Sequence, residues 1–250
     1  MIMKNNFEMA ADIIKKSSHC IVFSGAGISV ESGIPPFRGE GGLWTKYDPS
    51  FIELDNFYRE PEKCWIQIKK IFYDFMGVAR PNSAHTALAE LQQAGYIKEI
   101  ITQNIDNLHQ MAGSTDVYEF HGNTRMLICT GCSSLSPVTP EILSQLPPVC
   151  SKCGDVLKPD FIFFGEDIPG DVYSDSLVAA RQCDAMIIVG ASGEVMPAGN
   201  LPYIAKRAGA SIIEVNTSDS NYTGALTDIF LQGKAGETMD RLKELVLTAV

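Results

Sequence analysis

The chain of 250 residues lacks any apolar run near the roughly 20 residues that a membrane span needs. Its first twenty residues lack the apolar core of a secretory signal and have the pattern of an amphipathic helix instead. Basic residues are few: the chain has 20 Lys and Arg but 30 Asp and Glu, so its net charge is −10. We therefore expect a soluble, cytoplasmic protein with no membrane partner and no direct nucleic-acid partner.

The chain also lacks an even set of cysteines, because it has seven. An odd number without an export signal argues against a disulfide framework and favours reduced thiols or a metal site. Cys20, Cys64 and Cys183 stand alone among apolar residues, and we expect them to be buried as small hydrophobic side chains.

The remaining four cysteines have the spacing of a zinc ribbon. Cys129 and Cys132 form one CxxC pair, and Cys150 and Cys153 form a second one 17 residues later. Four thiolates leave no open coordination position, so the predicted zinc is structural. A redox CxxC is the alternative, and two matched pairs argue against it.

Short apolar runs alternate with helical patterns along most of the chain. This order predicts an α/β fold with a Rossmann-like, doubly wound parallel sheet. The expected strands are His19–Ser24, Ile97–Thr102, Val117–Phe120, Phe161–Phe164, Ala185–Val189 and Ser211–Val215. The expected helices are Ser83–Gln93 with Ser83 as N-cap, Asp171–Gln182, Leu201–Ala208 and Gly236–Val246.

Two stretches break this alternation and read as insertions that form a smaller lobe. Residues 35–80 are rich in aromatics, Pro and Gly and turn helical from Pro61, and residues 125–157 hold the zinc-ribbon cysteines. We expect a single catalytic domain over 1–250, with a Rossmann lobe at about 1–34, 81–124 and 158–250. The ligand should lie at the carboxyl ends of the strands.

A glycine turn, Gly25-Ala26-Gly27-Ile28-Ser29, follows the first expected strand. Glycines at this position let backbone N–H groups approach a pyrophosphate. Val30 replaces the usual third glycine, and no strand about 20 residues later ends in an acidic residue, as the ordinary fingerprint requires. A tight strand–helix turn without a ligand therefore remains the alternative.

The segment 32–39 follows, with two prolines that restrict the backbone. Phe37 could cover a reactive sugar, and Arg38 is a natural partner for phosphate oxygens. The glycines that follow suggest a lid over a ligand, while a surface loop with a solvated arginine is the alternative.

Polar residues also follow two expected strands. Gln103, Asn104 and Asp106 come after Ile97–Thr102, and His121 comes after Val117–Phe120. A histidine at a strand end can accept a proton near neutral pH. The alternatives are that Asp106 caps the next helix and that His121 is structural; we expect a structural role for His109.

These motifs resemble those of the sirtuins, NAD-dependent protein lysine deacylases, over nearly the whole chain. The matching pieces are GAGIS, SGIP with FRG, TQNID with LHQMAG, EFHG, the four cysteines, FFGE at 163–166, GAS at 190–192, EVN at 214–216 and GKAGE at 233–237. The implied fold is a Rossmann sheet whose smaller lobe combines a helical insertion with the zinc ribbon.

The resemblance implies that NAD binds between the lobes as a co-substrate. Its pyrophosphate would lie on the glycine turn, its nicotinamide carboxamide near Ile105 and Asp106, and its adenosine near Ala235. The implied NAD-binding residues are Gly25, Ala26, Gly27, Phe37, Arg38, Gln103, Asn104, Ile105, Asp106, Gly190, Ser192, Asn216 and Ala235.

The implied reaction begins when the acyl oxygen of an acyl-lysine attacks the anomeric carbon as nicotinamide leaves. His121 is then the general base on the ribose hydroxyls, and Asn104 orients ribose and water, with Asp106 as the third catalytic residue. Free lysine and O-acyl-ADP-ribose result. The substrate, a protein or peptide, would add as a strand beside Phe164, Gly165 and Glu166, near Val195, and we expect the protein to be a monomer.

The chain departs from the sirtuin pattern at a few positions. Pro36 stands where many members carry Asp or Thr, and Lys158 replaces a common arginine. Gly193 and Glu194 replace an apolar pair beside the expected peptide, which bears on sequence preference. Protein ADP-ribosyltransfer, an NAD-linked oxidoreductase and a non-catalytic NAD or ADP-ribose sensor are the alternative functions.

The residues that line the acyl tunnel give one further expectation. Sirtuins that prefer acidic acyl groups carry a Tyr-x-x-Arg pair on one helix, here expected at Pro61–Phe75. An alignment on Trp65 puts Ile68 and Ile71 at those two positions, which favours neutral acyl groups. The alternative is that both isoleucines face the core.

Overall fold

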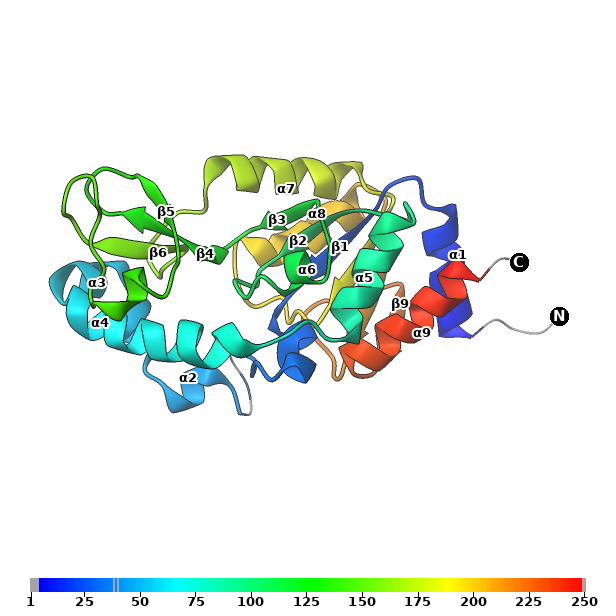
Figure 1. Cartoon of the computed structure of the whole chain (residues 1–250). Coiled ribbons are helices and arrows are strands. Elements are labelled where there is room, and N and C mark those ends of the chain that lie inside the picture. Colours follow the sequence, from blue (N-terminus) through cyan, green and yellow to red (C-terminus); the bar gives the residue numbers. More distant parts are fainter. Residues whose placement is uncertain (1–4, 38, 40, 249–250) are drawn as a thin grey trace.

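The structure is a computed structural model that describes residues 5–37, 39 and 41–248 (Figure 1). Its centre is a six-stranded sheet in the order β3-β2-β1-β7-β8-β9, and every neighbouring pair is parallel. The predicted doubly wound sheet is therefore confirmed. Its strands are β1 (Cys20–Ser24), β2 (Ile97–Thr102), β3 (Val117–Glu119), β7 (Ala185–Val189), β8 (Ser211–Asn216) and β9 (Ile229–Gln232).

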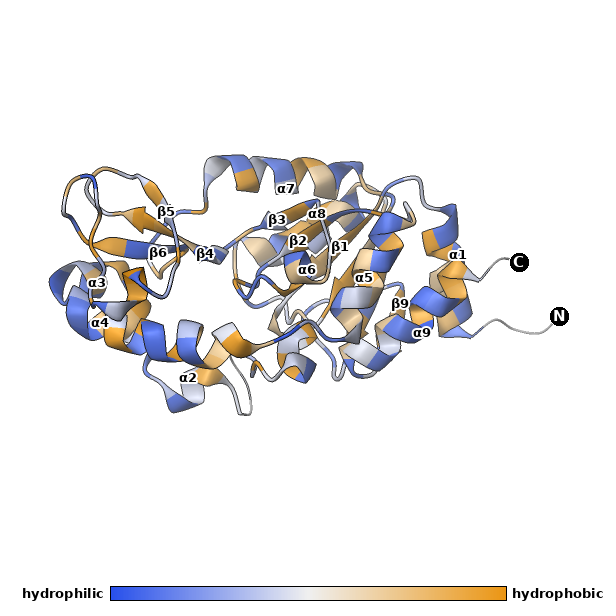
Figure 2. Ribbon diagram, viewed as in Figure 1, coloured by the Kyte–Doolittle hydropathy of each residue, from blue (hydrophilic) through white to orange (hydrophobic). Residues whose placement is uncertain are grey.

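Helices cover both faces of this sheet. Side chains on one face of β1, such as Val22, pack with α1 (Asn6–Lys16), α5 (Ser83–Gln93) and α9 (Ala235–Leu247). Those on the other face, such as Phe23, pack with α7 (Gly170–Gln182) and α8 (Leu201–Arg207). Figure 2 shows hydrophobic colouring on the central strands and mixed colouring along the helices, as expected for a sheet buried on both faces.

A second, antiparallel sheet lies at the end of the molecule away from the two termini (Figure 1). Its order is β5-β4-β6, formed by β4 (Gly122–Cys129), β5 (Leu135–Pro137) and β6 (Leu157–Phe161). It shares one hydrophobic core with a helical segment, and Trp65 Nε1 in that segment donates to Leu157 O at 2.8 Å. The helical segment contains α2 (Leu43–Lys46), α3 (Leu54–Arg59) and α4 (Pro61–Ile68).

Several short helical turns complete the fold. The helix expected over Pro61–Phe75 is α-helical only to Ile68, and a π-helical turn follows at Lys69–Phe75. The remaining short elements are α6 (Leu108–Met111) and the 3₁₀ turns Ala26–Ser32, Pro49–Ile52, Met76–Val78, Ile142–Ser144 and Ala198–Asn200.

Three expectations about the elements are wrong. Phe161–Phe164 is not a strand of the parallel sheet, because Phe161 ends β6 and Phe164 forms an isolated bridge with Glu53. A short apolar run does not show which sheet it joins. The sixth strand, β9, was not expected. Asn82 caps α5 in place of Ser83, since its Oδ1 accepts from the Ala84 N–H at 2.9 Å.

The cysteines behave as expected. Cys20, Cys64 and Cys183 are buried, and all seven cysteines are free thiols, with no disulfide among them. Within the described ranges, no helix combines the length and apolar character required to cross a membrane.

Asp184 joins the start of β7 to the loop that enters β1. Its carboxylate accepts from the Ser17 hydroxyl, from the N–H and hydroxyl of Ser18, and from the His19 N–H. Partial burial acts to raise the pKa of Asp184, but these hydrogen bonds outweigh it and lower the pKa well below its ordinary value. The folded state therefore favours the ionised form.

A depressed carboxyl pKa contributes stability above the unfolded value, about 3.9, and that stability is lost as the pH falls below it. Asp184→Asn should lower the unfolding free energy at pH 7 by no more than about 1.5 kcal/mol, because hydrogen bonds contribute about 0.5–1.5 kcal/mol each and solvent screens this exposed carboxylate. It should also make stability less dependent on pH below about 4. Urea unfolding at pH 7 and pH 3, with the exposed Asp175→Asn as control, measures both effects. If the unfolding free energy depended on pH equally in Asp184→Asn and in the wild type, the stabilising role of the Asp184 carboxylate would be contradicted.

Candidate functional site

A cavity of about 1420 Å³ opens at the carboxyl ends of β1, β7 and β8. It lies where the strand order changes direction, between β1 and β7, which is the usual ligand position in such sheets. Among the predicted site residues, those that line it are Gly25, Ala26, Gly27, Phe37, Gln103, Asn104, Ile105, His121, Phe164, Gly165, Glu166, Gly190, Ser192, Val195, Asn216 and Ala235. Arg38 lies outside the described residues.

The glycine turn packs directly against the loop that follows β7. The Gly27 N–H donates to Gly190 O at 2.9 Å, and a Cβ on Gly27 would lie 2.6 Å from Gly190 Cα. A Cβ on Gly25 would lie 2.8 Å from Gly190 O. The glycines are therefore required for the contact between two loops, and a 3₁₀ helix, Ala26–Ser32, begins within the glycine turn.

The segment 32–39 borders the cavity, since Pro36, Phe37 and Gly39 belong to its lining. The Phe37 ring packs on Trp44 with centroids 5.4 Å apart, and the Trp44 N–H donates to Phe37 O at 3.0 Å. The segment is thus part of the site wall rather than a loop directed only to solvent.

The side chains of Asn104 and Asp106 both form a hydrogen bond with the hydroxyl of Ser29, a residue that the sequence analysis did not assign to the site. Asn104 Nδ2 donates to Gly25 O at 3.2 Å and to Ser29 Oγ at 3.1 Å, and Ser29 Oγ donates to Asp106 Oδ2 at 2.6 Å. The other carboxylate oxygen accepts from the Leu108 N–H at 3.0 Å, so Asp106 also caps the short helix α6. Burial raises the pKa of Asp106, while these hydrogen bonds act against the rise. Asp106 is not part of the lining that the structure describes.

His121 lies between β3 and β4 with one ring nitrogen fixed. Its Nδ1 is 3.0 Å from Gln103 O, and because a carbonyl oxygen only accepts, Nδ1 must carry the proton. Nε2 is then an unprotonated acceptor. Burial lowers the pKa of His121, and the hydrogen bond to Gln103 partly offsets this. The ring is therefore neutral and basic at Nε2 at neutral pH.

His109 lies beneath the cavity rather than in its lining. Its Nε2 is 2.9 Å from Ser24 Oγ, which donates to Thr102 Oγ1 at 2.8 Å. Burial lowers the pKa of His109 to about 3 and that of its neighbour His85 to about 4. Both rings are neutral at pH 7, in agreement with the structural role expected for His109.

The loops after β7, β8 and β9 form the opposite end of the cavity. Asn216 Nδ2 donates to Ala191 O at 3.2 Å, and the Gly233 N–H donates to Asn216 O at 2.9 Å. Ala235 begins α9 there.

Gly193, which departs from the sirtuin pattern, must be glycine for a steric reason. Its φ is +79°, and a Cβ on it would lie 2.8 Å from Cζ of the buried Tyr222.

The segment expected to bind the peptide has one free backbone position. The Phe164 N–H donates to Ile52 O at 2.9 Å, and Phe164 O accepts from the Leu54 N–H at 3.0 Å, so both groups are already used. Within the described residues, the N–H and C=O of Gly165 have no hydrogen-bond partner. A bound strand would therefore pair with Gly165 in preference to Phe164.

An apolar region of the lining includes residues that the sequence analysis missed, namely Trp44, Ile52, Phe72, Tyr173 and Met196. Ile68 and Ile71 are fully buried in the core and are not in this lining, so the alternative stated for them is correct.

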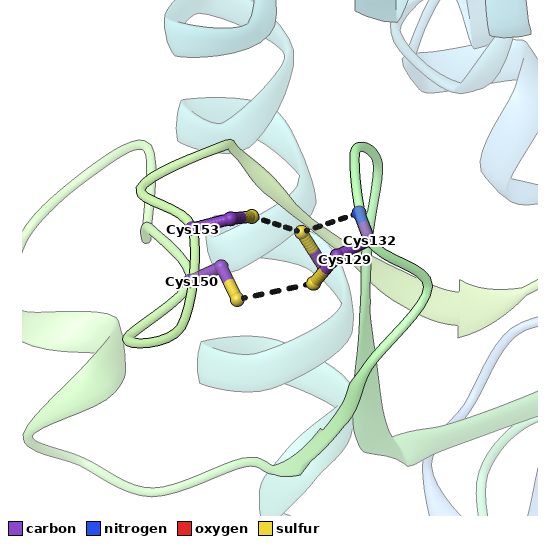
Figure 3. A group of neighbouring side chains, drawn as sticks. All are labelled: Cys129, Cys132, Cys150 and Cys153. Carbon is purple, nitrogen blue, oxygen red and sulfur yellow. Dashed lines mark hydrogen bonds between the residues drawn. The ribbon is translucent and has the colours of Figure 1, made fainter.

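The four zinc-ribbon cysteines form a separate cluster outside the described cavity lining (Figure 3). Their Sγ atoms all lie within 4.8 Å of one another, with 3.3 Å between Cys129 and Cys153 and 3.8 Å between Cys132 and Cys150. A tetrahedron with Zn–S bonds of about 2.3 Å has edges of about 3.8 Å. Two turns that direct four thiols to one point fit a structural zinc ion.

Comparison with known proteins agrees with this geometry. The family model described as "Sir2 family" matches residues 25–197. The chain is 42% identical over 240 residues to NAD-dependent protein deacylase 2 of Pyrobaculum aerophilum, covering 94% of each chain. It is 44% identical over 242 residues to the NAD-dependent protein deacylase of Pyrococcus furiosus, covering 93% of this chain and 94% of the relative.

Solved structures of Sir2 proteins also superpose closely on this chain. An ADP-ribose complex of a mutant Sir2 homologue superposes with a TM-score of 0.90 at 39% identity, covering 98% of this chain and 96% of the other. A complex of Sir2 with a p53 peptide and NAD+ superposes with a TM-score of 0.88 at 33% identity, covering 97% and 98%. The chain therefore belongs to the Sir2 family.

Proposed function

We propose that this protein is an NAD-dependent protein lysine deacylase. It transfers the acyl group of an acyl-lysine to ADP-ribose and releases nicotinamide. The observation that carries the proposal is the position of His121: its basic Nε2 belongs to one cavity that has the glycine turn and the free Gly165 backbone in its lining. Relatives named as deacylases and a peptide–NAD+ complex of a similar structure support it.

The residues have distinct roles in the proposed reaction. The Ala26 N–H of the glycine turn receives the pyrophosphate, because the N–H groups of Gly25, Gly27 and Ile28 already donate within the protein. Phe37 and Gln103 border the nicotinamide ribose. Ile105, which lines the cavity, receives the nicotinamide carboxamide, and Asp106 supports this region through its hydrogen bond from Ser29. The adenosine half lies against the loops after β7, β8 and β9, at Gly190, Ser192, Asn216 and Ala235.

His121 acts after nicotinamide has left and the acyl oxygen has bonded to the anomeric carbon. Nε2 accepts a proton from a ribose hydroxyl, while the bond from Nδ1 to Gln103 O keeps the ring in the required tautomer and orientation. Asn104 orients ribose and water, and its bonds to Gly25 and Ser29 hold the side chain in place. Asp106 holds Ser29 in turn.

We propose that the cavity lies between a Rossmann lobe (about 1–34, 81–124 and 158–250) and a smaller lobe (about 35–80 and 125–157), with zinc stabilising the latter. Seven free cysteines favour a reducing compartment, which supports a cytoplasmic location.

Mass spectrometry of the products from an acetyl-lysine peptide and NAD tests the function. Deacylation yields equal amounts of free-lysine peptide, nicotinamide and O-acetyl-ADP-ribose. A peptide heavier by one ADP-ribose would indicate ADP-ribosyltransfer, and reduced NAD would indicate an oxidoreductase. Binding of NAD without any turnover would indicate a sensor.

The cavity lining predicts a preference for neutral acyl groups. Its apolar region includes Trp44, Ile52 and Phe72, and the only lysine or arginine among the described lining residues is Lys234, next to Ala235. A succinyl carboxylate would be desolvated without a partner, at a cost of several kcal/mol. We expect kcat/KM for acetyl-lysine to exceed that for succinyl-lysine at least about tenfold, since about 1.4 kcal/mol corresponds to a factor of ten.

One peptide carrying acetyl, butyryl or succinyl groups measures this preference. Butyryl has the same number of carbons as succinyl but no charge, so it separates size from charge. Rapid turnover of butyryl and slow turnover of succinyl would confirm the electrostatic reason. Desuccinylation as fast as deacetylation would refute it.

A further inference from the structure

Lys158 is a buried cation that the proposed reaction does not use. It lies in β6, is only 6% exposed and is not part of the described cavity lining. Burial lowers the pKa of Lys158, while the nearby Glu166 carboxylate acts to raise it. Lysine is rarely buried without a partner, so its contacts require an explanation.

The ammonium group of Lys158 uses all three of its donors. Nζ donates to Pro159 O at 2.9 Å, to Phe161 O at 2.8 Å and to Glu166 Oε2 at 2.9 Å. It also lies 4.2 Å from the centre of the Phe163 ring, within range of a cation–π interaction. One side chain thus binds three points along the segment 159–166.

Glu166, which is held by Lys158, also forms hydrogen bonds with the backbone of the turn 163–166. The carboxylate oxygen that accepts from Lys158 also accepts from the Phe163 N–H at 2.6 Å, and the Glu166 N–H donates to Phe163 O at 3.0 Å. Gly165 within this turn has a φ of +92°, which suits glycine. The turn 163–166 is therefore closed by both the side chain and the backbone of Glu166.

The other side of the same turn is held by the helical segment, because Phe164 exchanges hydrogen bonds with Ile52 and Leu54. Gly165 is then left with a free N–H and a free C=O, on a turn whose Phe164, Gly165 and Glu166 line the cavity. A substrate strand adds more tightly when these two groups are held in place before it arrives.

We propose that Lys158 is a positioning residue for the acyl-lysine peptide. It neutralises Glu166 and fixes the 163–166 turn, so that Gly165 presents its backbone to the substrate. The inference rests on the proposed deacylase function. Preorganisation strengthens binding because the segment need not be ordered when the ligand arrives.

Lys158→Met keeps the length of the side chain and removes its charge and donors. Ordering one residue on binding costs about 1–2 kcal/mol, so KM for the peptide should rise about 5- to 30-fold. KM for NAD should stay unchanged, because the glycine turn and the loops after β7 and β8 make no contact with Lys158. Lys158→Arg, which restores a cation with several donors, should recover most of the peptide affinity.

Lys243→Met is the matched control. Lys243 also forms ion pairs, with Glu90 and Asp240, and its side chain is 17% exposed, but it lies on α9 away from the peptide segment. The Lys243→Met enzyme should have the same KM for the peptide as the wild type. The proposal would be overturned if Lys158→Met left the KM for the peptide unchanged, or if it raised the KM for the peptide and the KM for NAD equally.

Amide hydrogen exchange in the wild-type protein tests the same idea without a variant and without turnover, in case Lys158→Met does not fold. The Phe163 amide should be protected before any peptide is added, whereas the Gly165 amide should exchange rapidly and become protected with peptide. An unprotected Phe163 amide would overturn the proposal. Absence of deacylation in the wild type would instead count against the proposed function.

Discussion

His121→Ala is expected to lower kcat for deacylation by about 10²–10⁴-fold, the usual effect of losing one general base. Its Nε2 is unprotonated at pH 7 and free to accept a proton, because Nδ1 is committed to Gln103 O. The fold should be unaffected, since the imidazole makes a single hydrogen bond to the protein, at that carbonyl.

Steady-state rates with an acetyl-lysine peptide and saturating NAD measure this effect. His19→Ala is the control, because His19 pairs with Glu99 near the start of β1, at the opposite end of the strand from the cavity. It should retain the rate of the wild type. A His121→Ala enzyme with nearly normal deacylation would show that another group is the base.

The pH profile provides a second test of the same residue. A base must be unprotonated to act, and burial lowers the pKa of His121 below the ordinary value of about 6.5. We therefore expect kcat/KM to stay level through neutral pH and to decline only below about pH 6.5. A decline that begins above that pH, or the same profile in a slow His121→Ala enzyme, would contradict the assignment.

Cys129→Ser is expected to abolish zinc binding and unfold the ribbon, with loss of activity as a consequence. Structural zinc contributes about 10–16 kcal/mol in small zinc-finger peptides, which is comparable with the whole stability of a domain. Cys129, Cys150 and Leu157 belong to the same core as Trp65 and Phe161, so an unfolded ribbon also exposes the helical segment that borders the cavity.

Elemental analysis, circular dichroism and thermal unfolding of the purified variant measure these effects. Cys183→Ala is the matched control: this thiol is also buried, but it packs with α7 and α8, far from the ribbon. The control should keep one zinc ion per chain. A Cys129→Ser protein that is free of zinc, folded and active would show that the metal is dispensable.

The sequence by itself determined the features that local signals encode. The strands Ala185–Val189 and Ile97–Thr102 were found at their observed bounds, because the apolar residues of each strand lie between polar turns and can be recognised without knowledge of the neighbouring strands. The four cysteines were found because ligand spacing is local to each CxxC turn. Most of the predicted site residues do come together in one cavity, since the carboxyl ends of parallel strands meet at one edge.

Only the tertiary structure decided the features that depend on contacts between distant segments. Gly27 must be glycine because Gly190, 163 positions later in the chain, packs against it. Ser29 joins Asn104 and Asp106, which lie 75 and 77 positions later. Phe72 lines the cavity in place of Ile68 and Ile71, which are buried in the core that the helical segment shares with the second sheet. The sequence showed only that Lys158 replaces a common arginine. Its three hydrogen-bond acceptors are brought together by the folding of the segment 159–166 around it, which the sequence does not encode locally.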